Sequence, residues 1–161
     1  FTLAKLAPDR LQSLILGGTA PYADPDPEAG SAWHAEQASR LAGQTTAEFV
    51  ADLEGFLYSQ GFPPLSPRMK AAMLKHDLQA LAAWHRSVIE EVPAYDDILG
   101  AISVPCLIYA GENTGEYADA ARAAQEIPGA VFVGISNGEH LEGGTWIDIL
   151  WPHISRIVKS A

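Results

Sequence analysis

A histidine follows the later of two strongly apolar runs in the C-terminal third of the chain. His140 ends the segment Gly138-Glu139-His140, just after the apolar run 131–135. An imidazole on such a loop can take a proton from a serine or cysteine and return it to a leaving group, provided that a carboxylate fixes its tautomer and stabilises the imidazolium. His140 is therefore the candidate general base.

The sequence leaves the carboxylate partner of this histidine open. The apolar run 104–110 ends in the turn Gly111-Glu112-Asn113-Thr114. The Thr114 hydroxyl can hydrogen-bond a ring nitrogen but carries no negative charge. Glu116 lies two residues further on and can supply the charge, although it is equally well explained as a first-turn glutamate that the helix dipole favours. Glu112 lies nearer the strand end and is expected to point away.

The elements that must position these residues are a strand, a helix and a second strand. The segments 106–110, 116–127 and 131–135 predict two parallel strands joined by a crossover helix. A shorter apolar run at 11–16, ended by Gly17-Gly18, predicts an earlier strand. Open parallel sheets usually hold about four to six strands, so this sheet is incomplete and the first strand has a bare edge.

A helical block without strand signals separates the first strand from the other two. Residues 29–92 show helical periodicity, with caps expected at Thr45 paired with Glu48, at Ser66 and at Asp77. The large apolar side chains of this block are most simply interpreted as its core; they include Trp33, Phe49, Leu53, Phe56, Leu57, Leu78, Leu81, Trp84, Val88 and Val92.

The amino-acid composition restricts the classes of protein to which this chain can belong. The 161 residues are 48% apolar, which is enough to bury the core of one globular domain. A formal charge of −10 repels nucleic acid and anionic membrane surfaces, and no apolar run is long enough to cross a bilayer. The lone Cys106 cannot form an intrachain disulfide, which fits a cytoplasmic location.

No cofactor or metal is expected from the remaining polar residues. His34, His76, His85 and His153 lack the paired spacing of a zinc site and are interpreted as solvated or partly buried helix positions. The glycines form no phosphate-binding loop.

The order of these features resembles the C-terminal part of an α/β-hydrolase. The residues that carry the resemblance are Gly17-Gly18 after the first strand, the segment 102–112, Ile127-Pro128-Gly129-Ala130, Gly138-Glu139-His140 and Trp151-Pro152. Within the family the chain looks most like small esterases, lactonases and carbon–carbon hydrolases whose cap is a helical insertion after the sixth strand.

The resemblance implies an α/β fold class, as a partial α/β-hydrolase fold of C-terminal parallel strands, flanking helices and a helical cap. Residues 1–27 would be core, comprising the end of the helix after the nucleophile elbow and the sixth strand. Residues 28–100 would be the cap, and 101–161 would be core again, with the last two strands, the crossover helix and the C-terminal helix.

The resemblance also implies that the nucleophile is a serine in a Gly-x-Ser-x-Gly elbow. That pattern does not occur in this chain, which begins with Phe1 rather than methionine. We therefore expect a piece of a longer protein, or a subunit, whose N-terminal half, in the same or a separate chain, supplies the serine. In relatives the residue at the position of Thr114 is usually the aspartate that orients the histidine.

The expected function is hydrolysis of a small-molecule carboxylic ester, lactone or related carbonyl substrate. His140 would be the general base, with Glu116 or Thr114 as its partner. The substrate pocket is assigned to Gly18, Trp84 and Leu141, because ligand sites are mostly apolar. The alternative is a non-catalytic ligand-binding or interaction protein that has the same fold but has lost the acid of the triad.

Overall fold

The computed structural model describes residues 1–161 except 24, 60, 63, 91–93, 141–145 and 161. The chain divides into two compact units. The first comprises Phe1–Ala23 and Pro93–Ala161 and is called the sheet unit. The second comprises Asp24–Val92 and is called the helical unit.

The sheet unit is built on three parallel strands in the order β1-β2-β3. These are β1 (Leu14–Gly17), β2 (Cys106–Gly111) and β3 (Val131–Ile135). The predicted α/β class with parallel strands is confirmed. The first strand begins at Leu14 rather than Leu11, because Pro8–Arg10 forms a 3₁₀ turn, η1, whose last hydrogen bond runs from the Leu11 N–H to the Pro8 carbonyl.

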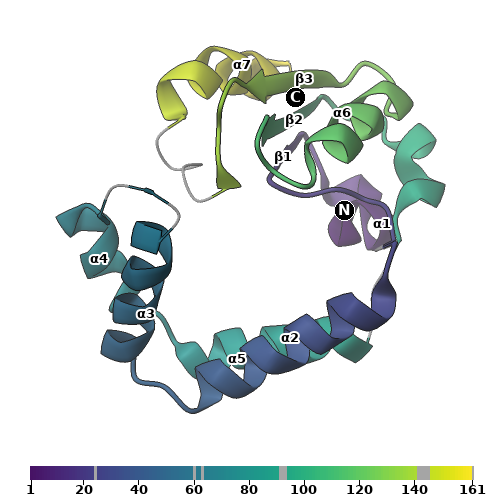
Figure 1. The fold of residues 1–161 in the computed structure, drawn as a ribbon. Helices are drawn as coiled ribbons and strands as arrows, with labels where there is room; N and C mark the ends of the chain where they lie inside the picture. Colours follow the sequence, from purple (N-terminus) through teal and green to yellow (C-terminus); the bar gives the residue numbers. More distant parts are fainter. Residues whose placement is uncertain (24, 60, 63, 91–93, 141–145, 161) are drawn as a thin grey trace. The chain divides into compact units, whose positions relative to one another are not determined.

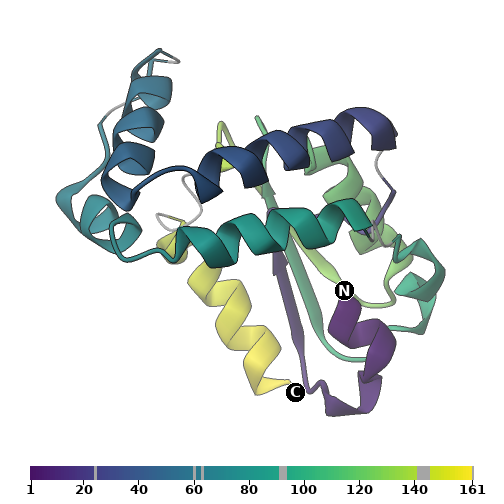
Figure 2. The ribbon, with the colours of Figure 1, turned by 90° about the horizontal axis from the view of Figure 1, so that it is seen from below.

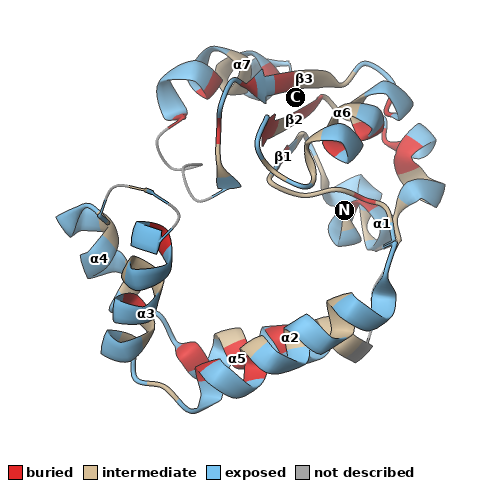
Figure 3. Ribbon diagram, in the orientation of Figure 1, coloured by how far each residue is buried: buried red, intermediate tan, exposed pale blue. Residues whose placement is uncertain are grey.

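Helices cover both faces of this sheet, as apolar parallel strands require. Cys106 and Ile108 point to the face covered by α1 (Thr2–Leu6) and α6 (Tyr117–Glu126). Leu107, between them, points to the opposite face, where α7 (Ile147–Lys159) packs against it. Figure 1 shows α6 and α7 on either side of the strands, and Figure 3 shows the buried residues gathered at these contacts.

The chain's one cysteine lies at the start of β2 and has no exposed surface. Burial raises the pKa of the Cys106 thiol to about 11. Since the thiolate is the nucleophilic form, a buried thiol in this state is a core residue. Cys106 is therefore excluded as the nucleophile partner of a general base.

The segment that returns to the sheet packs with the sheet unit. It contains the 3₁₀ helix η2 (Asp96–Ala101), whose Leu99 is part of the core beneath α6. Lys5 of α1 forms an ion pair of 2.9 Å with Asp97 of η2. Residues 93–100 thus group with the strands, whereas the sequence suggested a boundary after residue 100.

The helical unit contains four helices and, in its described residues, no strand. They are α2 (Pro27–Ala42), α3 (Thr46–Ser59), α4 (Pro67–Met73) and α5 (Leu78–Glu90). Figure 2 shows that α2 and α5 lie side by side and run in opposite directions. Their contact buries Leu41, Leu78 and Ala82.

The predicted helix caps are confirmed. The Thr45 N–H donates to the Glu48 carboxylate at 2.8 Å, and the Glu48 N–H donates back to the Thr45 hydroxyl at 3.3 Å. The Ser66 hydroxyl accepts from the Met69 N–H, and the Asp77 carboxylate accepts from the N–H groups of the second and third residues after it. These bonds satisfy amide groups that would otherwise lack partners at the helix starts.

The predicted core of the helical unit is wrong for its largest side chains. Trp33, Phe56 and Trp84 are each more than half exposed. The buried residues of α2 and α5 are instead Ala38, Leu41, Leu78, Ala82 and His85, of which Leu41, Leu78 and Ala82 form one cluster. Val92, predicted on the same face as Trp84, lies outside the described residues.

A membrane-crossing helix is not found anywhere in the described part of the chain. The helices there are too short or too polar to span a bilayer.

Candidate active site

Backbone hydrogen bonds join the two loops that follow β2 and β3. The Glu112 N–H donates to the Ile135 carbonyl at 3.0 Å, and the Asn113 N–H donates to the Gly138 carbonyl at 3.1 Å. A Cβ atom on Gly111 would lie 2.2 Å from the Gly138 carbonyl oxygen, so only glycine permits this approach. The loop that carries His140 is therefore held directly against the end of β2.

We expect Gly111→Ala to lower the free energy of unfolding by about 1–3 kcal/mol, because the added methyl group meets rigid backbone rather than a flexible side chain. Gly115→Ala is the matched control, since a Cβ atom there has no neighbour within 4 Å. Urea unfolding of both variants measures the difference. Equal stability of the two variants would contradict the close approach of the loops.

The central contact of the site joins His140 to Glu116. The Nδ1 atom of His140 lies 2.7 Å from Oε1 of Glu116. Because a carboxylate only accepts hydrogen bonds, Nδ1 carries a proton, and in the neutral imidazole the lone pair is on Nε2. The His140 side chain is 63% exposed, whereas that of Glu116 is 22% exposed. The arrangement leaves Nε2 as a base while a partly buried charge stands ready to stabilise the imidazolium.

Glu116 owes this position to the start of α6. It is the N-cap residue of that helix, and its side chain makes no capping hydrogen bond. The carboxylate is thus directed to the imidazole rather than to the amide groups of its own helix. The helix dipole explains why a glutamate is favoured at this backbone position. It does not explain why the carboxylate contacts the imidazole.

The other two candidates for the acid have different partners. The Thr114 hydroxyl donates to the Gly111 carbonyl at 2.9 Å within its own turn. The Glu112 carboxylate accepts from the Ser136 hydroxyl at 3.3 Å and from the Asn137 N–H at 3.2 Å. Glu112 therefore stabilises the loop before His140 instead of contacting the imidazole.

Gly18 lies directly beneath the imidazole. Its φ of +59° belongs to the left-handed region that favours glycine. A Cβ atom there would lie 3.0 Å from Cε1 of His140 and 3.6 Å from Oε1 of Glu116. The end of β1 thus contributes a surface against which the histidine and the glutamate rest.

A cavity of about 100 Å³ opens at this point, at the carboxyl ends of the strands. Besides the predicted Gly18, Thr114, Glu116 and His140, it is lined by residues that sequence reasoning missed: Gly17, Tyr109, Gly111 and Trp146. The Tyr109 ring occupies the space above Gly17, where a Cβ atom would lie 2.0 Å from the ring. Tyr109 could have been predicted from the sequence, because it is the last large side chain before the turn after β2.

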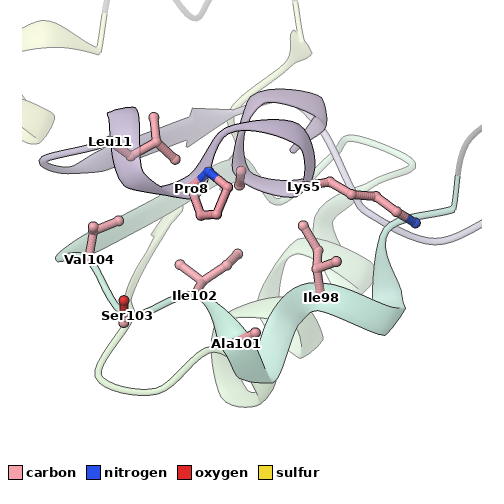
Figure 4. Close-up of a pocket in the computed structure, with 9 residues that line it drawn as sticks. Lys5, Pro8, Leu11, Ile98, Ala101, Ile102, Ser103 and Val104 are labelled. Carbon is pink, nitrogen blue, oxygen red and sulfur yellow. The ribbon is translucent and has the colours of Figure 1, made fainter.

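A second cavity, of about 190 Å³, lies at the opposite end of the sheet (Figure 4). Pro8, Ile98 and Ile102 line it with apolar surface, while the Lys5 ammonium points outward to its ion pair with Asp97. Ligands of open parallel sheets bind at the carboxyl ends of the strands, and this cavity lies where β1 and β2 begin. The smaller cavity is therefore the candidate site.

Comparison with solved structures identifies the fold. The thermophilic esterase from Thermogutta terrifontis superposes with a TM-score of 0.73 at 20% identity, over 97% of this chain and 58% of that one. MenH from S. aureus gives 0.76 at 24%, over 92% and 59%. The enol-lactonase from Burkholderia xenovorans gives 0.69 at 16%, over 98% and 60%. This chain adopts part of the α/β-hydrolase fold.

The α/β-hydrolase similarity is one of structure. No protein-family model and no curated protein sequence matches the chain. The chain spans about 60% of the length of the solved structures above.

The two other residues assigned to the substrate pocket stay predictions. Trp84 belongs to the helical unit, and Leu141 lies outside the described residues. Among the described serines, none is hydrogen-bonded to His140. Groups of three or more histidine, cysteine or carboxylate side chains that could hold a metal ion are also not found in the described part of the chain.

Proposed function

We propose that this chain supplies the base and the acid of a hydrolase that acts on a carboxylic ester, lactone or related carbonyl substrate. The contact between His140 Nδ1 and Glu116 Oε1 at the carboxyl end of the sheet carries this proposal. The nucleophile would be a serine from the complementary part of the fold.

In this mechanism Nε2 of His140 takes the proton of the serine hydroxyl as its oxygen attacks the carbonyl carbon. The imidazolium, stabilised by Glu116, then gives that proton to the departing alcohol oxygen. Water repeats the two steps on the acyl-enzyme and releases the acid. The reaction needs no cofactor.

The open edge of β1 supports the proposal of a complementary part. In the described residues β1 pairs only with β2, and Ile15 on this edge strand is 38% exposed. An exposed apolar edge strand is a site for pairing with another strand. We propose that a strand from the rest of the fold, in the same or a separate chain, pairs there. Intact mass and sequencing of the purified protein distinguish the two arrangements.

The experiment that tests the proposed function uses the full-length protein that contains this chain. We expect it to hydrolyse 4-nitrophenyl butyrate and to lose this activity after treatment with phenylmethylsulfonyl fluoride, which modifies an activated serine. Intact mass should show the covalent adduct on the wild-type protein and none on the His140→Ala variant, which is the control because its serine is not activated. A wild-type protein that hydrolyses neither esters nor lactones would overturn the proposal.

One observation favours a second candidate, a ligand-binding protein without catalysis. Thr114 stands where relatives usually carry the aspartate of the triad, and its hydroxyl is engaged with the Gly111 carbonyl. If Glu116 does not serve as the acid, His140 lacks a charge partner. Binding of carboxylic acids to a protein that shows no hydrolysis would support this candidate. A cytoplasmic location is proposed for either function.

A further inference from the structure

Two histidines in the helical unit form a hydrogen bond between α2 and α5. His34 Nδ1 lies 2.9 Å from His85 Nδ1. His85 is 8% exposed and is the buried polar residue of the described part of the chain. The two residues, called here the histidine pair, continue the helix contact that buries Leu41, Leu78 and Ala82. A polar contact thus occupies a position where apolar side chains would be expected.

Proton counting restricts the charge that this contact can hold. A hydrogen bond between two Nδ1 atoms needs one proton on one nitrogen and a lone pair on the other. The neutral pair meets this condition. So does the pair with one added proton, because that proton goes to an Nε2 atom. With two added protons both Nδ1 atoms carry a proton, and two positive charges face each other at 2.9 Å.

The surroundings of the pair are aromatic. The Trp33 ring lies 4.9 Å from the His34 ring, and the Trp84 ring lies 4.8 Å from the His85 ring, between centroids. Indole rings attract a cation but do not titrate. They therefore supply no negative charge that would offset the repulsion between two protonated imidazoles.

Among the described residues, no carboxylate forms a hydrogen bond or an ion pair with His34 or His85, which bond to each other. Glu36 and Arg86, the charged residues nearest to them in sequence, are exposed. Burial, followed by the charge of His34, lowers the pKa of His85. The repulsion therefore acts within the pair itself.

We propose that the histidine pair is an acid-sensitive contact, which holds α2 against α5 with at most one added proton and opens when both imidazoles are charged. The direction follows from proton linkage. The folded-state pKa of His85 is below its unfolded value, which is about 6.5 for an ordinary histidine. The contribution of the pair is complete above that value and is lost as the pH falls below it.

The test combines histidine titration by NMR with amide hydrogen exchange on the full-length protein. We expect His85 to titrate below about pH 6.5, the value of an ordinary histidine. Between about pH 8 and about pH 5, we expect the protection of α2 and α5 amides, corrected for intrinsic exchange, to fall at least tenfold more than that of α6 amides. The amides of the C-terminal half of α6 are the internal control, because this helix contains no histidine and the His140–Glu116 contact lies at its other end.

Two variants separate proton coupling from simple loss of structure. His34→Asn keeps a polar group next to His85 but cannot be charged. We expect this variant to raise the pKa of His85 and to reduce the pH dependence of α2 and α5 protection. His76→Asn is the matched control and should leave both unchanged. If His85 titrates at about pH 6.5 or above, or if α2 and α5 protection follows α6 at all pH values, the proposal is wrong. The wild-type measurements decide this even if His34→Asn does not fold.

Discussion

Replacing His140 with alanine is expected to lower kcat of the full-length protein by about 10²–10⁴-fold, the range for loss of a general base. The imidazole is largely exposed and contacts Glu116 and the surface formed by Gly18. Its removal therefore costs little packing, and the near-ultraviolet circular dichroism and the unfolding midpoint should match those of the wild type. Steady-state hydrolysis of an aryl ester measures the loss.

The matched control for this variant is His153→Ala. His153 lies in α7 of the same unit and does not line the candidate cavity. Its replacement should leave kcat within a few-fold of the wild type. If a folded His140→Ala protein retained most of its activity, the assignment of the general base would be wrong.

Glu116→Gln is expected to lower kcat by about 10²–10⁴-fold, because the neutral amide cannot stabilise an imidazolium as the carboxylate does. The side chain keeps its size, and Glu116 makes no capping bond that the change would remove. KM should change much less than kcat, since the glutamate acts through His140 rather than through the substrate. The same ester assay gives both constants.

Two further variants decide which residue is the acid. Glu112 lies in the loop after β2, and its carboxylate contacts Ser136 and Asn137 rather than the imidazole. The kcat of a Glu112→Gln variant should therefore remain near the wild-type value. Adding Thr114→Asp to Glu116→Gln places a carboxylate where relatives usually carry it and should restore part of the activity. A Glu116→Gln protein as active as the wild type would exclude this glutamate as the triad acid.

The sheet could be predicted from the sequence because its signals are local and strong. Continuous apolar runs, such as 106–110, bounded by glycine and proline, are explained best by buried parallel strands. The parallel order then places the ends of these strands at one edge, and with them His140 and Glu116. The geometry that favours Glu116 over Thr114 was not predictable, since it depends on backbone angles at the start of α6.

The core of the helical unit was predicted only in part: Leu57 and Leu78 are buried as expected, whereas the largest aromatic side chains are not. Trp84 is strongly apolar but exposed, whereas Ala82 and His85 on the same helix are buried. The contact between α2 and α5 accommodates Ala82 beside two leucines, and the His34–His85 hydrogen bond makes a polar residue acceptable there. Neither effect can be seen in one helix considered alone.

Chemical labelling of the buried Cys106 thiol can report opening of the sheet unit. A thiol reagent reacts with the thiolate. While β2 is covered, burial blocks access to the sulfur atom and the raised pKa keeps the thiol protonated. Because the chain contains one cysteine, each modification event records an exposure of the central strand. The labelling rate of the unmodified protein therefore measures how often the sheet separates from its covering helices, without any introduced probe.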